Sequence, residues 1–200
     1  RQLDICSRAG RADLTYVGEM DIRWRGLLVA AACALGLGAF APGASAGTVE
    51  NVGGVLRFTD LDGAKDTLEV AQPDAATITV TDVGLPTATA VTPGAGCTAV
   101  TASSVSCATA GLTSIEVLLG GGDDELFVRS PNLPLTAQGG EGGDLFDDAE
   151  AGTGARSFNG EGGDDYMRAS ITPALAHDYV GGAGIDWVDY NYRGPNEGGV

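Results

Sequence analysis

Short runs of alternating apolar and polar residues make up much of the chain between residues 48 and 118. They are rich in Val, Ile and Thr, are separated by Gly, Pro or Asp, and include VLRF (55–58), DTLEV (66–70), ATITVTD (76–82) and SIEVLL (114–119). A period of two predicts half-buried β-strands, and the separating residues predict turns. No stretch after residue 46 has a helical period, so we predict an all-β fold that begins with a small antiparallel β unit over residues 47–118.

Glycine-rich clusters recur at a regular spacing in the second half of the chain. The four segments are LGGGDDELF (119–127), GGEGGDLFD (139–147), NGEGGDDYM (159–167) and GGAGIDWVD (181–189). Their sixth positions hold Asp124, Asp144, Asp164 and Asp186, and their eighth positions hold Leu126, Phe146, Tyr166 and Val188. A period of about twenty residues that occurs four times predicts a solenoid.

The four segments match the pattern Gly-Gly-x-Gly-x-Asp-x-apolar-x, so residues 119–189 resemble the RTX, or haemolysin-type calcium-binding, repeat family. The resemblance implies a short calcium-stabilised parallel β-roll/β-helix over residues 119–192, in which the apolar eighth residues point inward. Returning strands are then expected near Leu133–Ala137, Arg156–Phe158 and His177–Val180. The motif occurs once per turn, so we expect calcium loops along one side of the roll and ordinary turns along the other.

Calcium (Ca2+) binding by such loops has a physical basis. Calcium takes six to eight oxygen ligands, and glycine lets a loop turn backbone carbonyls toward one point because it tolerates positive φ. One loop cannot complete the shell, so we expect about three ions, each shared by two neighbouring loops. The candidate ligands are Gly120, Gly122, Asp123, Asp124, Gly140, Gly142, Asp144, Gly160, Gly162, Asp164, Gly182, Gly184 and Asp186.

A further acidic segment, DLDGAKDTLEV (60–70), does not fit a helix-loop-helix calcium motif. That motif needs glycine at its sixth position and glutamate at its twelfth. Here Gly63 is fourth and Ala71 is twelfth. We therefore expect a solvated hairpin turn in this segment.

The distribution of charge favours cations as partners. The chain has a formal net charge of −16. Residues 119–200 contribute −11, from 15 acids and 4 arginines, whereas residues 1–47 contribute +1. Such an acidic half repels nucleic acid and anionic membrane surfaces. We expect calcium ions to offset the repulsion, which couples the folding of residues 119–189 to calcium; a cell-surface or protein partner stays open.

Residues 20–46 have the pattern of a secretory signal peptide. Two arginines precede an apolar run at 27–41, and Ala44-Ser45-Ala46 supplies the small residues of a cleavage site. A buried helix or a membrane anchor is the alternative, but the run is too short and glycine-rich to favour a span. We expect secretion with cleavage after Ala46, a non-native segment at 1–19, and a frayed or truncated tail at 193–200.

Two cysteines remain after the expected cleavage, Cys97 and Cys107. The segment CTAVTASSVSC is nearly symmetric about Ala102, so a hairpin would place the two thiols opposite each other. In an exported protein such a pair is expected to form a disulfide. The alternative is a metal-binding thiol pair, which the missing CxxC spacing and histidine companion disfavour.

The motifs of common enzymes are missing from the sequence. His177 is the one histidine, and HExxH, GxSxG and GK[ST] do not occur. We therefore expect a secreted, non-catalytic calcium-binding protein. The alternative is a fragment or accessory tail of a larger secreted enzyme or adhesin. The aromatic residues Trp187, Tyr190 and Tyr192 either cap the end of the solenoid or contact a partner.

Overall fold

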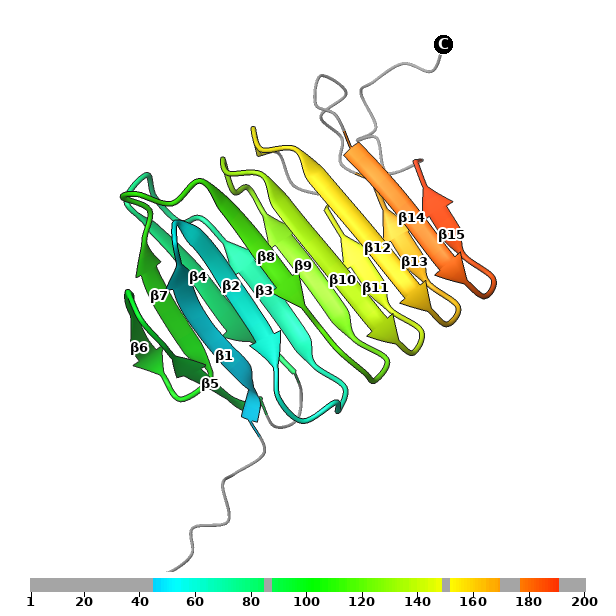
Figure 1. Cartoon of the computed structure of the whole chain (residues 1–200), viewed down its shortest axis with the longest axis horizontal. Coiled ribbons are helices and arrows are strands. Elements are labelled where there is room, and N and C mark those ends of the chain that lie inside the picture. The colour runs from blue at the N-terminus through cyan, green and yellow to red at the C-terminus, as the bar shows by residue number, and fades with distance from the viewer. Residues whose placement is uncertain (1–44, 85–87, 149–151, 170–176, 191–200) are drawn as a thin grey trace, which may run out of the picture. The chain divides into compact units, whose positions relative to one another are not determined.

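The computed structural model describes residues 45–84, 88–148, 152–169 and 177–190. Contacts between Cα atoms divide the chain into two units, Arg1–Pro42 and Gly43–Val200, and every described residue belongs to the second. That unit contains two β-sheets and, within the described ranges, no helix, which confirms the all-β class (Figure 1). The described residues accordingly hold no helix long and apolar enough to cross a membrane. The expected segments at 1–19 and 193–200, and the expected signal up to residue 44, lie outside these ranges.

The first sheet has seven strands in the order β14-β12-β10-β8-β2-β1-β5. Their bounds are Ser45–Val52 (β1), Val55–Asp60 (β2), Ala90–Pro93 (β5), Ser114–Leu118 (β8), Leu135–Glu141 (β10), Arg156–Gly162 (β12) and His177–Ala183 (β14). Strands β2, β8, β10, β12 and β14 pair in parallel. Strand β1 is antiparallel to β2 and parallel to β5, so the sheet is mixed.

The second sheet has eight strands in the order β15-β13-β11-β9-β3-β4-β7-β6. Their bounds are Thr67–Ala71 (β3), Thr77–Asp82 (β4), Cys97–Thr101 (β6), Ser104–Ala108 (β7), Glu125–Arg129 (β9), Leu145–Asp147 (β11), Tyr166–Arg168 (β13) and Trp187–Asp189 (β15). Strands β3, β9, β11, β13 and β15 pair in parallel, whereas β4, β7 and β6 are antiparallel.

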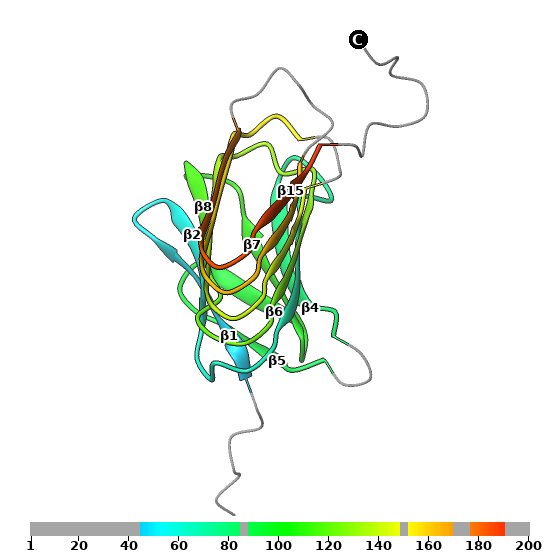
Figure 2. The ribbon, with the colours of Figure 1, turned by 90° about the vertical axis from the view of Figure 1, so that its right-hand side faces the viewer.

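The chain passes repeatedly from the first sheet to the second. It does so at β2–β3, β8–β9, β10–β11, β12–β13 and β14–β15, and each pass lies beside the next. Seen from the β14 and β15 end, the two sheets face each other and the short loops that join them nest along one side (Figure 2). Strand pairing therefore runs without interruption across the expected border between residues 118 and 119.

Most strands lie where the hydrophobic pattern predicts them. The four runs of the first half coincide with β2, β3, β4 and β8, and the expected returning strands coincide with β10, β12 and β14. Strands β1 and β5 were not expected. The prediction of a hairpin at DLDGAKD is wrong, because its flanking strands β2 and β3 belong to different sheets and residues 61–66 connect them.

The core lies between the two sheets and consists of alternate residues from each strand. Leu126 and Phe146 are fully buried, as predicted from their motif positions. The rings of Phe146 and Phe158 stack with centroids 5.0 Å apart, and Phe158 lies 5.7 Å from Tyr179 in the next turn. Burying one such side chain stabilises the fold by about 1.5–3 kcal/mol. This column of rings ties successive turns together across the core.

The inward position of Tyr166 is wrongly predicted. Strand register pairs Leu145 with Tyr166 and Phe146 with Met167, so Met167 is the inward residue and is fully buried. Tyr166 is half-buried on the outer face, and its hydroxyl donates a hydrogen bond to Asp189 at 2.8 Å. The third motif is thus one residue out of register with its neighbours.

A buried ion pair holds the connections on the opposite side from the nested loops. Nε of Arg156 lies 3.2 Å from Oδ1 of Asp148, and both side chains are 1% exposed. The guanidinium also donates to the carbonyls of Gly154 at 2.6 Å and Pro131 at 3.0 Å. The side chain of Arg156 therefore joins two neighbouring connections, each of which leads from the second sheet back to the first.

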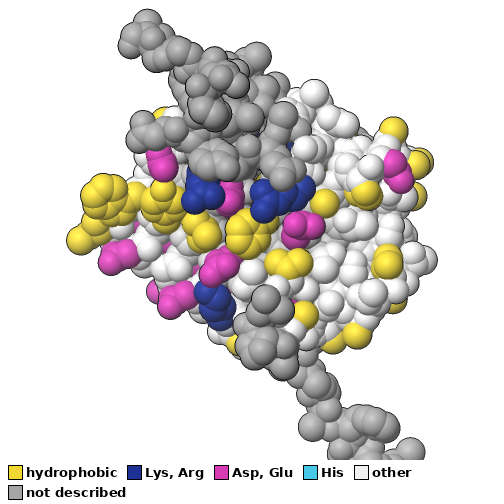
Figure 3. Space-filling view, turned by 180° about the vertical axis from the view of Figure 1, so that it is seen from behind, with side chains coloured by type: hydrophobic (Ala, Val, Ile, Leu, Met, Phe, Trp, Pro, Cys, Tyr) yellow, Lys and Arg dark blue, Asp and Glu magenta, His cyan; other side chains and the backbone are white. Residues whose placement is uncertain are grey.

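Ion pairs at the surface are arranged differently. Acidic, basic and apolar side chains are mixed on the outer face of the second sheet (Figure 3). Lys65, in the loop before β3, pairs with Glu125 at 2.7 Å, and both side chains are partly exposed. Arg168 pairs with Asp147 at 2.8 Å, and there the carboxylate is buried. An exposed pair such as that of Lys65 with Glu125 contributes about 0–1 kcal/mol, so it affects stability much less than the buried pair of Arg156 with Asp148 does.

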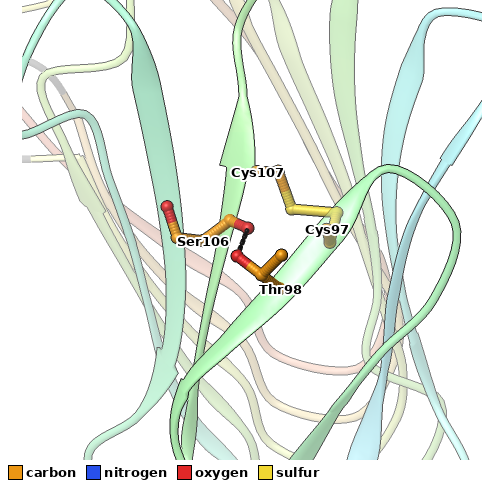
Figure 4. The surroundings of a disulfide bond; sticks show 4 residues. All are labelled: Cys97, Thr98, Ser106 and Cys107. Carbon is orange, nitrogen blue, oxygen red and sulfur yellow. Dashed lines mark hydrogen bonds between the residues drawn. A yellow bond between two sulfur atoms is a disulfide. The ribbon is translucent and has the colours of Figure 1, made fainter.

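The cysteines form a disulfide between Cys97 and Cys107, which confirms the predicted pairing (Figure 4). The two residues are directly opposite in the β6–β7 pair, with Cα atoms 4.3 Å apart. Beside it, the hydroxyl of Thr98 donates to the carbonyl of Ser106 at 3.4 Å. The disulfide attaches β6, the edge strand of the second sheet, to β7.

We expect Arg156→Ala to lower the free energy of unfolding by about 3–5 kcal/mol, because the carboxylate of Asp148 would stay buried without its partner. The matched control is Arg57→Ala, which removes a half-exposed pair with Glu116 at 2.5 Å and should cost about 1 kcal/mol or less. Urea denaturation followed by circular dichroism measures both. Equal losses in the two variants would contradict the role given to the buried pair.

We expect the double substitution Cys97→Ser and Cys107→Ser to lower the free energy of unfolding by about 2–3 kcal/mol, the chain-entropy value for so short a loop. Denaturation of the oxidised chain and of the variant under identical conditions measures the difference. A variant as stable as the oxidised chain would show that the bridge constrains nothing.

Candidate metal centre

Five loops connect the first sheet to the second along one side. We call them the loop row; they are residues 61–66, 119–124, 142–144, 163–165 and 184–186. Each loop ends on an aspartate directly before a strand of the second sheet. These residues are Asp66, Asp124, Asp144, Asp165 and Asp186, and we call them the aspartate ladder.

Each aspartate of the ladder is hydrogen-bonded to the next one in the same way. The backbone N–H of Asp124 donates to Oδ1 of Asp144 at 2.9 Å, and the backbone N–H of Asp144 donates to Oδ1 of Asp165 at 2.8 Å. The same bond joins Asp66 to Asp124 at 2.6 Å and Asp165 to Asp186 at 3.1 Å. One carboxylate oxygen of each later aspartate therefore binds the backbone of the preceding turn; these aspartates are Asp124, Asp144, Asp165 and Asp186.

The second carboxylate oxygens have no such partner. Asp66, Asp124, Asp144 and Asp165 are at most 2% exposed, and the Oδ2 atom of each is buried with no hydrogen bond from the described residues. A buried carboxylate oxygen without a donor is costly in an apolar environment. The ladder therefore needs either protons or a cation to balance these oxygens.

Glycine is required beside these oxygens. Oδ2 of Asp144 fills the space that a Cβ on Gly139 would occupy, and Oδ2 of Asp165 does the same at Gly160. In a second column, a Cβ on Gly142 would overlap the carbonyl oxygen of Gly122 in the neighbouring loop, and Gly142 has a φ of 127°. The loops thus stack more closely than residues with side chains allow.

The structure assigns the predicted site residues of three motifs to consistent positions. Three predicted aspartates belong to the ladder, and the predicted glycines form two columns beside it. The aspartates are Asp124, Asp144 and Asp186; the columns are Gly120, Gly140 and Gly182, and Gly122, Gly142 and Gly184. Asp123 is exposed, and its Oδ1 accepts a hydrogen bond from the N–H of Gly143 at 3.0 Å.

The third motif differs from its prediction by one residue. Glu161 pairs with Gly140 and Gly182 and has a φ of 74°. The predicted residues Gly160, Gly162 and Asp164 therefore each precede by one residue the position that corresponds to the site residues of the other motifs. The ladder residue is Asp165, whereas Asp164 is exposed and accepts from the N–H of Ile185 at 2.8 Å. The motif can be aligned with either Asp164 or Asp165 at its sixth position. The apolar Met167, two residues after Asp165, is the sequence signal that favours Asp165.

Sequence reasoning also missed Asp66. The segment around Asp66 has no Gly-Gly pair, and a comparison with the helix-loop-helix motif does not reveal the ladder position of Asp66. Its backbone carbonyl accepts from the N–H of Glu125 at 2.9 Å, just as the carbonyl of Asp124 accepts from Leu145 at 2.8 Å. An aspartate followed two residues later by the inward Leu68 was the usable signal.

Electrostatics agree with the burial. Burial, together with the nearby carboxylates of Asp60 and Asp124, raises the pKa of Asp66 to about 8. Burial also raises the pKa of Asp124 to about 7 and that of Asp144 to about 6, although the hydrogen bond that each accepts from the ladder lowers it. The pKa of Asp165 is raised for the same reason. Charged carboxylates are therefore disfavoured in the ladder unless a cation lies beside them.

A metal ion in the loop row would need more than carboxylates. Within residues 45–84, 88–148, 152–169 and 177–190, no group of three or more His, Cys, Asp or Glu side chains is arranged to hold a metal. Calcium also accepts backbone carbonyl oxygens as ligands, and the stacked glycine loops are rich in them. The donor set that fits is thus ladder carboxylates with loop carbonyls.

Comparison of the chain with known protein families and proteins gives no relative. Family models, curated proteins and solved structures all give no match. The resemblance to RTX repeats rests on the four sequence motifs.

We expect the metal-free protein to become less stable as the pH rises. The pKa of Asp66, Asp124 and Asp144 is higher in the folded chain than the ordinary value of about 3.9, so their contribution is fully present below that value. It is lost as the pH passes through about 6, about 7 and about 8. Melting temperatures in chelator between about pH 5 and about pH 9 should therefore fall.

The control for this pH series is Asp66→Asn combined with Asp124→Asn, which removes the two highest pKa values and should flatten the profile. A melting temperature that rises over the same range would contradict the assignment of these buried carboxyl groups.

Proposed function

We propose that the chain is a secreted calcium-binding protein. Its loop row binds Ca2+ between stacked turns of a short parallel β-roll, and its folding depends on extracellular calcium. The observation that carries the proposal is the set of buried ladder carboxylates whose second oxygens have no hydrogen-bond partner. Calcium would supply positive charge to these oxygens, and the loops would supply further oxygen ligands.

The loop row suits calcium better than magnesium. Calcium accepts six to eight oxygens in flexible geometry, whereas magnesium demands a near-ideal octahedron and gives up its water reluctantly. A loop built from glycine can adjust its carbonyls to a variable shell. Each ion would also offset two charges in a region with a net charge of −11, from 15 acids and 4 arginines in residues 119–200. We therefore expect calcium to bind in preference to magnesium.

The topology supports the β-roll part of the proposal. Five strands pair in parallel in each sheet, and the chain passes from one sheet to the other once per turn. The ladder bonds repeat at each of the four contacts between turns. The antiparallel strands β1, β4, β6 and β7 would then close the first end of the roll.

One feature supports export. A disulfide is typical of an oxidising compartment outside the cytosol. Cleavage after Ala46 would leave the β1–β2 pairs, which run from Gly47 with Asp60 to Val52 with Val55, but it would remove the buried Ala46 and the pairing of Ser45 with Ala90. Extracellular calcium modules bind at about 10⁻⁴–10⁻³ M, which suits this location.

One observation favours the alternative of an accessory part of a larger secreted enzyme or adhesin. The last described turn exposes large apolar side chains, including Ile185 at 67% and Trp187 at 66%. A solenoid whose last turn exposes such residues has a surface suited to contact with a further domain or protein. Tyr190 is also exposed and packs edge-on against Tyr179, 6.2 Å away, whereas Tyr192 lies outside the described residues.

We expect chelation at neutral pH to reduce the far-UV β signal of the full chain and to expand it, and calcium to reverse both changes. With a dissociation constant of about 10⁻⁴ M, calcium at about 1 mM would add about 1.4 kcal/mol of stability per site. Circular dichroism, calorimetry and size-exclusion chromatography measure these effects. An unchanged spectrum in excess chelator, together with no heat of calcium binding, would overturn the proposed function.

A matched pair of variants tests which aspartate of the third motif matters. Asp165→Asn and Asp164→Asn remove the same charge from adjacent positions, but only Asp165 belongs to the ladder. We expect Asp165→Asn to weaken calcium binding about tenfold, which corresponds to about 1.4 kcal/mol, and Asp164→Asn to weaken it less. The opposite order in a calorimetric titration would contradict the ladder as the ligand set.

A further inference from the structure

The first loop of the row, residues 61–66, has no glycine motif but makes the same contacts as the other loops. The N–H of Asp66 donates to Oδ1 of Asp124 at 2.6 Å, and the N–H of Glu125 donates to the carbonyl of Asp66 at 2.9 Å. Both bonds have counterparts at every later contact between loops. We call the contact between loops 61–66 and 119–124 the first step.

The first step contains two buried carboxylate oxygens that have no hydrogen-bond partner. Asp66 is 2% exposed and Asp124 is 1% exposed, and Oδ2 of each is buried with no donor from the described residues. The bond from the N–H of Asp66 to Oδ1 of Asp124 places the Asp124 carboxylate beside the backbone of Asp66. These are the same unbalanced oxygens that point to a cation elsewhere in the ladder.

Asp60, the last residue of β2, also approaches the second loop. Its oxygens accept from the N–H groups of Asp62 at 2.9 Å and Gly63 at 2.8 Å, which orients the side chain. A Cβ built on Gly120 would lie 2.7 Å from Oδ2 of Asp60, so this carboxylate approaches the second loop closely. Lys65 is engaged with Glu125 at 2.7 Å.

Backbone oxygens approach the second loop at the first step as they do later in the row. The carbonyl oxygen of Ala64 would lie 3.0 Å from a Cβ on Gly122, and that of Gly63 would lie 3.9 Å from a Cβ on Gly121. Gly122 has a φ of 122°, which a residue with a side chain rarely adopts. The glycines that make room in this loop therefore face residues 63 and 64.

We propose that the first step is itself a calcium site, built on the buried carboxylates of Asp66 and Asp124 and on backbone carbonyl oxygens of the loop 61–66, in addition to the three sites between the glycine-rich loops. The inference rests on the proposed function, and it raises the number of sites from three to four. Neither the repeat motif nor the helix-loop-helix pattern assigns a site to residues 60–66.

The test counts calcium ions bound to the full chain by equilibrium dialysis and resolves their affinities by calorimetry. We expect Asp66→Asn to bind one ion fewer than the unmodified chain. The matched control is Asp74→Asn, which removes the same charge from an exposed turn where the carboxylate accepts from the N–H groups of Ala76 and Thr77, both at 2.8 Å. This control should keep the full count.

The outcomes separate the two proposals. An unmodified chain that binds no calcium overturns the proposed function and this inference with it. An unmodified chain that binds calcium, with an Asp66→Asn variant of equal count and affinities, overturns the inference alone. If Asp66→Asn does not fold, Asp66→Glu decides, because it keeps the charge but displaces the carboxylate by one methylene: loss of one ion supports the site, and an unchanged count with unchanged affinities overturns it.

Discussion

The hydrogen bond from the N–H of one ladder aspartate to the carboxylate of the next is the interaction on which the rest of this structure depends. It repeats from Asp66 to Asp186 at distances from 2.6 to 3.1 Å. Because each bond joins a side chain of one turn to the backbone of its neighbour, it fixes both the spacing and the register of the turns. The parallel strands on either side of the loops follow from that register.

The same bond explains the glycines of the row. To accept the hydrogen bond, the carboxylate must turn into the space between the sheets, and its second oxygen then lies where a side chain would otherwise be. Gly139 and Gly160 leave that space, and Gly142 lets adjacent loops approach. These glycines are thus consequences of close stacking, and flexibility is not their main contribution.

The protein balances its buried carboxylates in two ways. On the return side, Asp148 has Arg156 at 3.2 Å, and the guanidinium also satisfies backbone carbonyls. The loop row has carboxylates that are equally buried, but the second oxygens of Asp66, Asp124, Asp144 and Asp165 have no donor among the described residues. A loop of glycines has no room for a long basic side chain, whereas a small cation fits between carbonyls and carboxylates. The calcium proposal depends on this difference between a carboxylate paired with an arginine and carboxylates that have no basic partner.

The sequence by itself determined most of the strands, although not β1 and β5, as well as the inward Leu126 and Phe146 and the pairing of Cys97 with Cys107, because period-two patterns and short hairpins are local. Only the tertiary structure decided between Asp164 and Asp165, since adjacent aspartates fit the motif equally and the pairing of β11 with β13 sets the frame. Asp66 could not be found from the motif either. It joins the ladder through Asp124, 58 residues away, and that contact exists only when β2 and β3 lie beside β8 and β9.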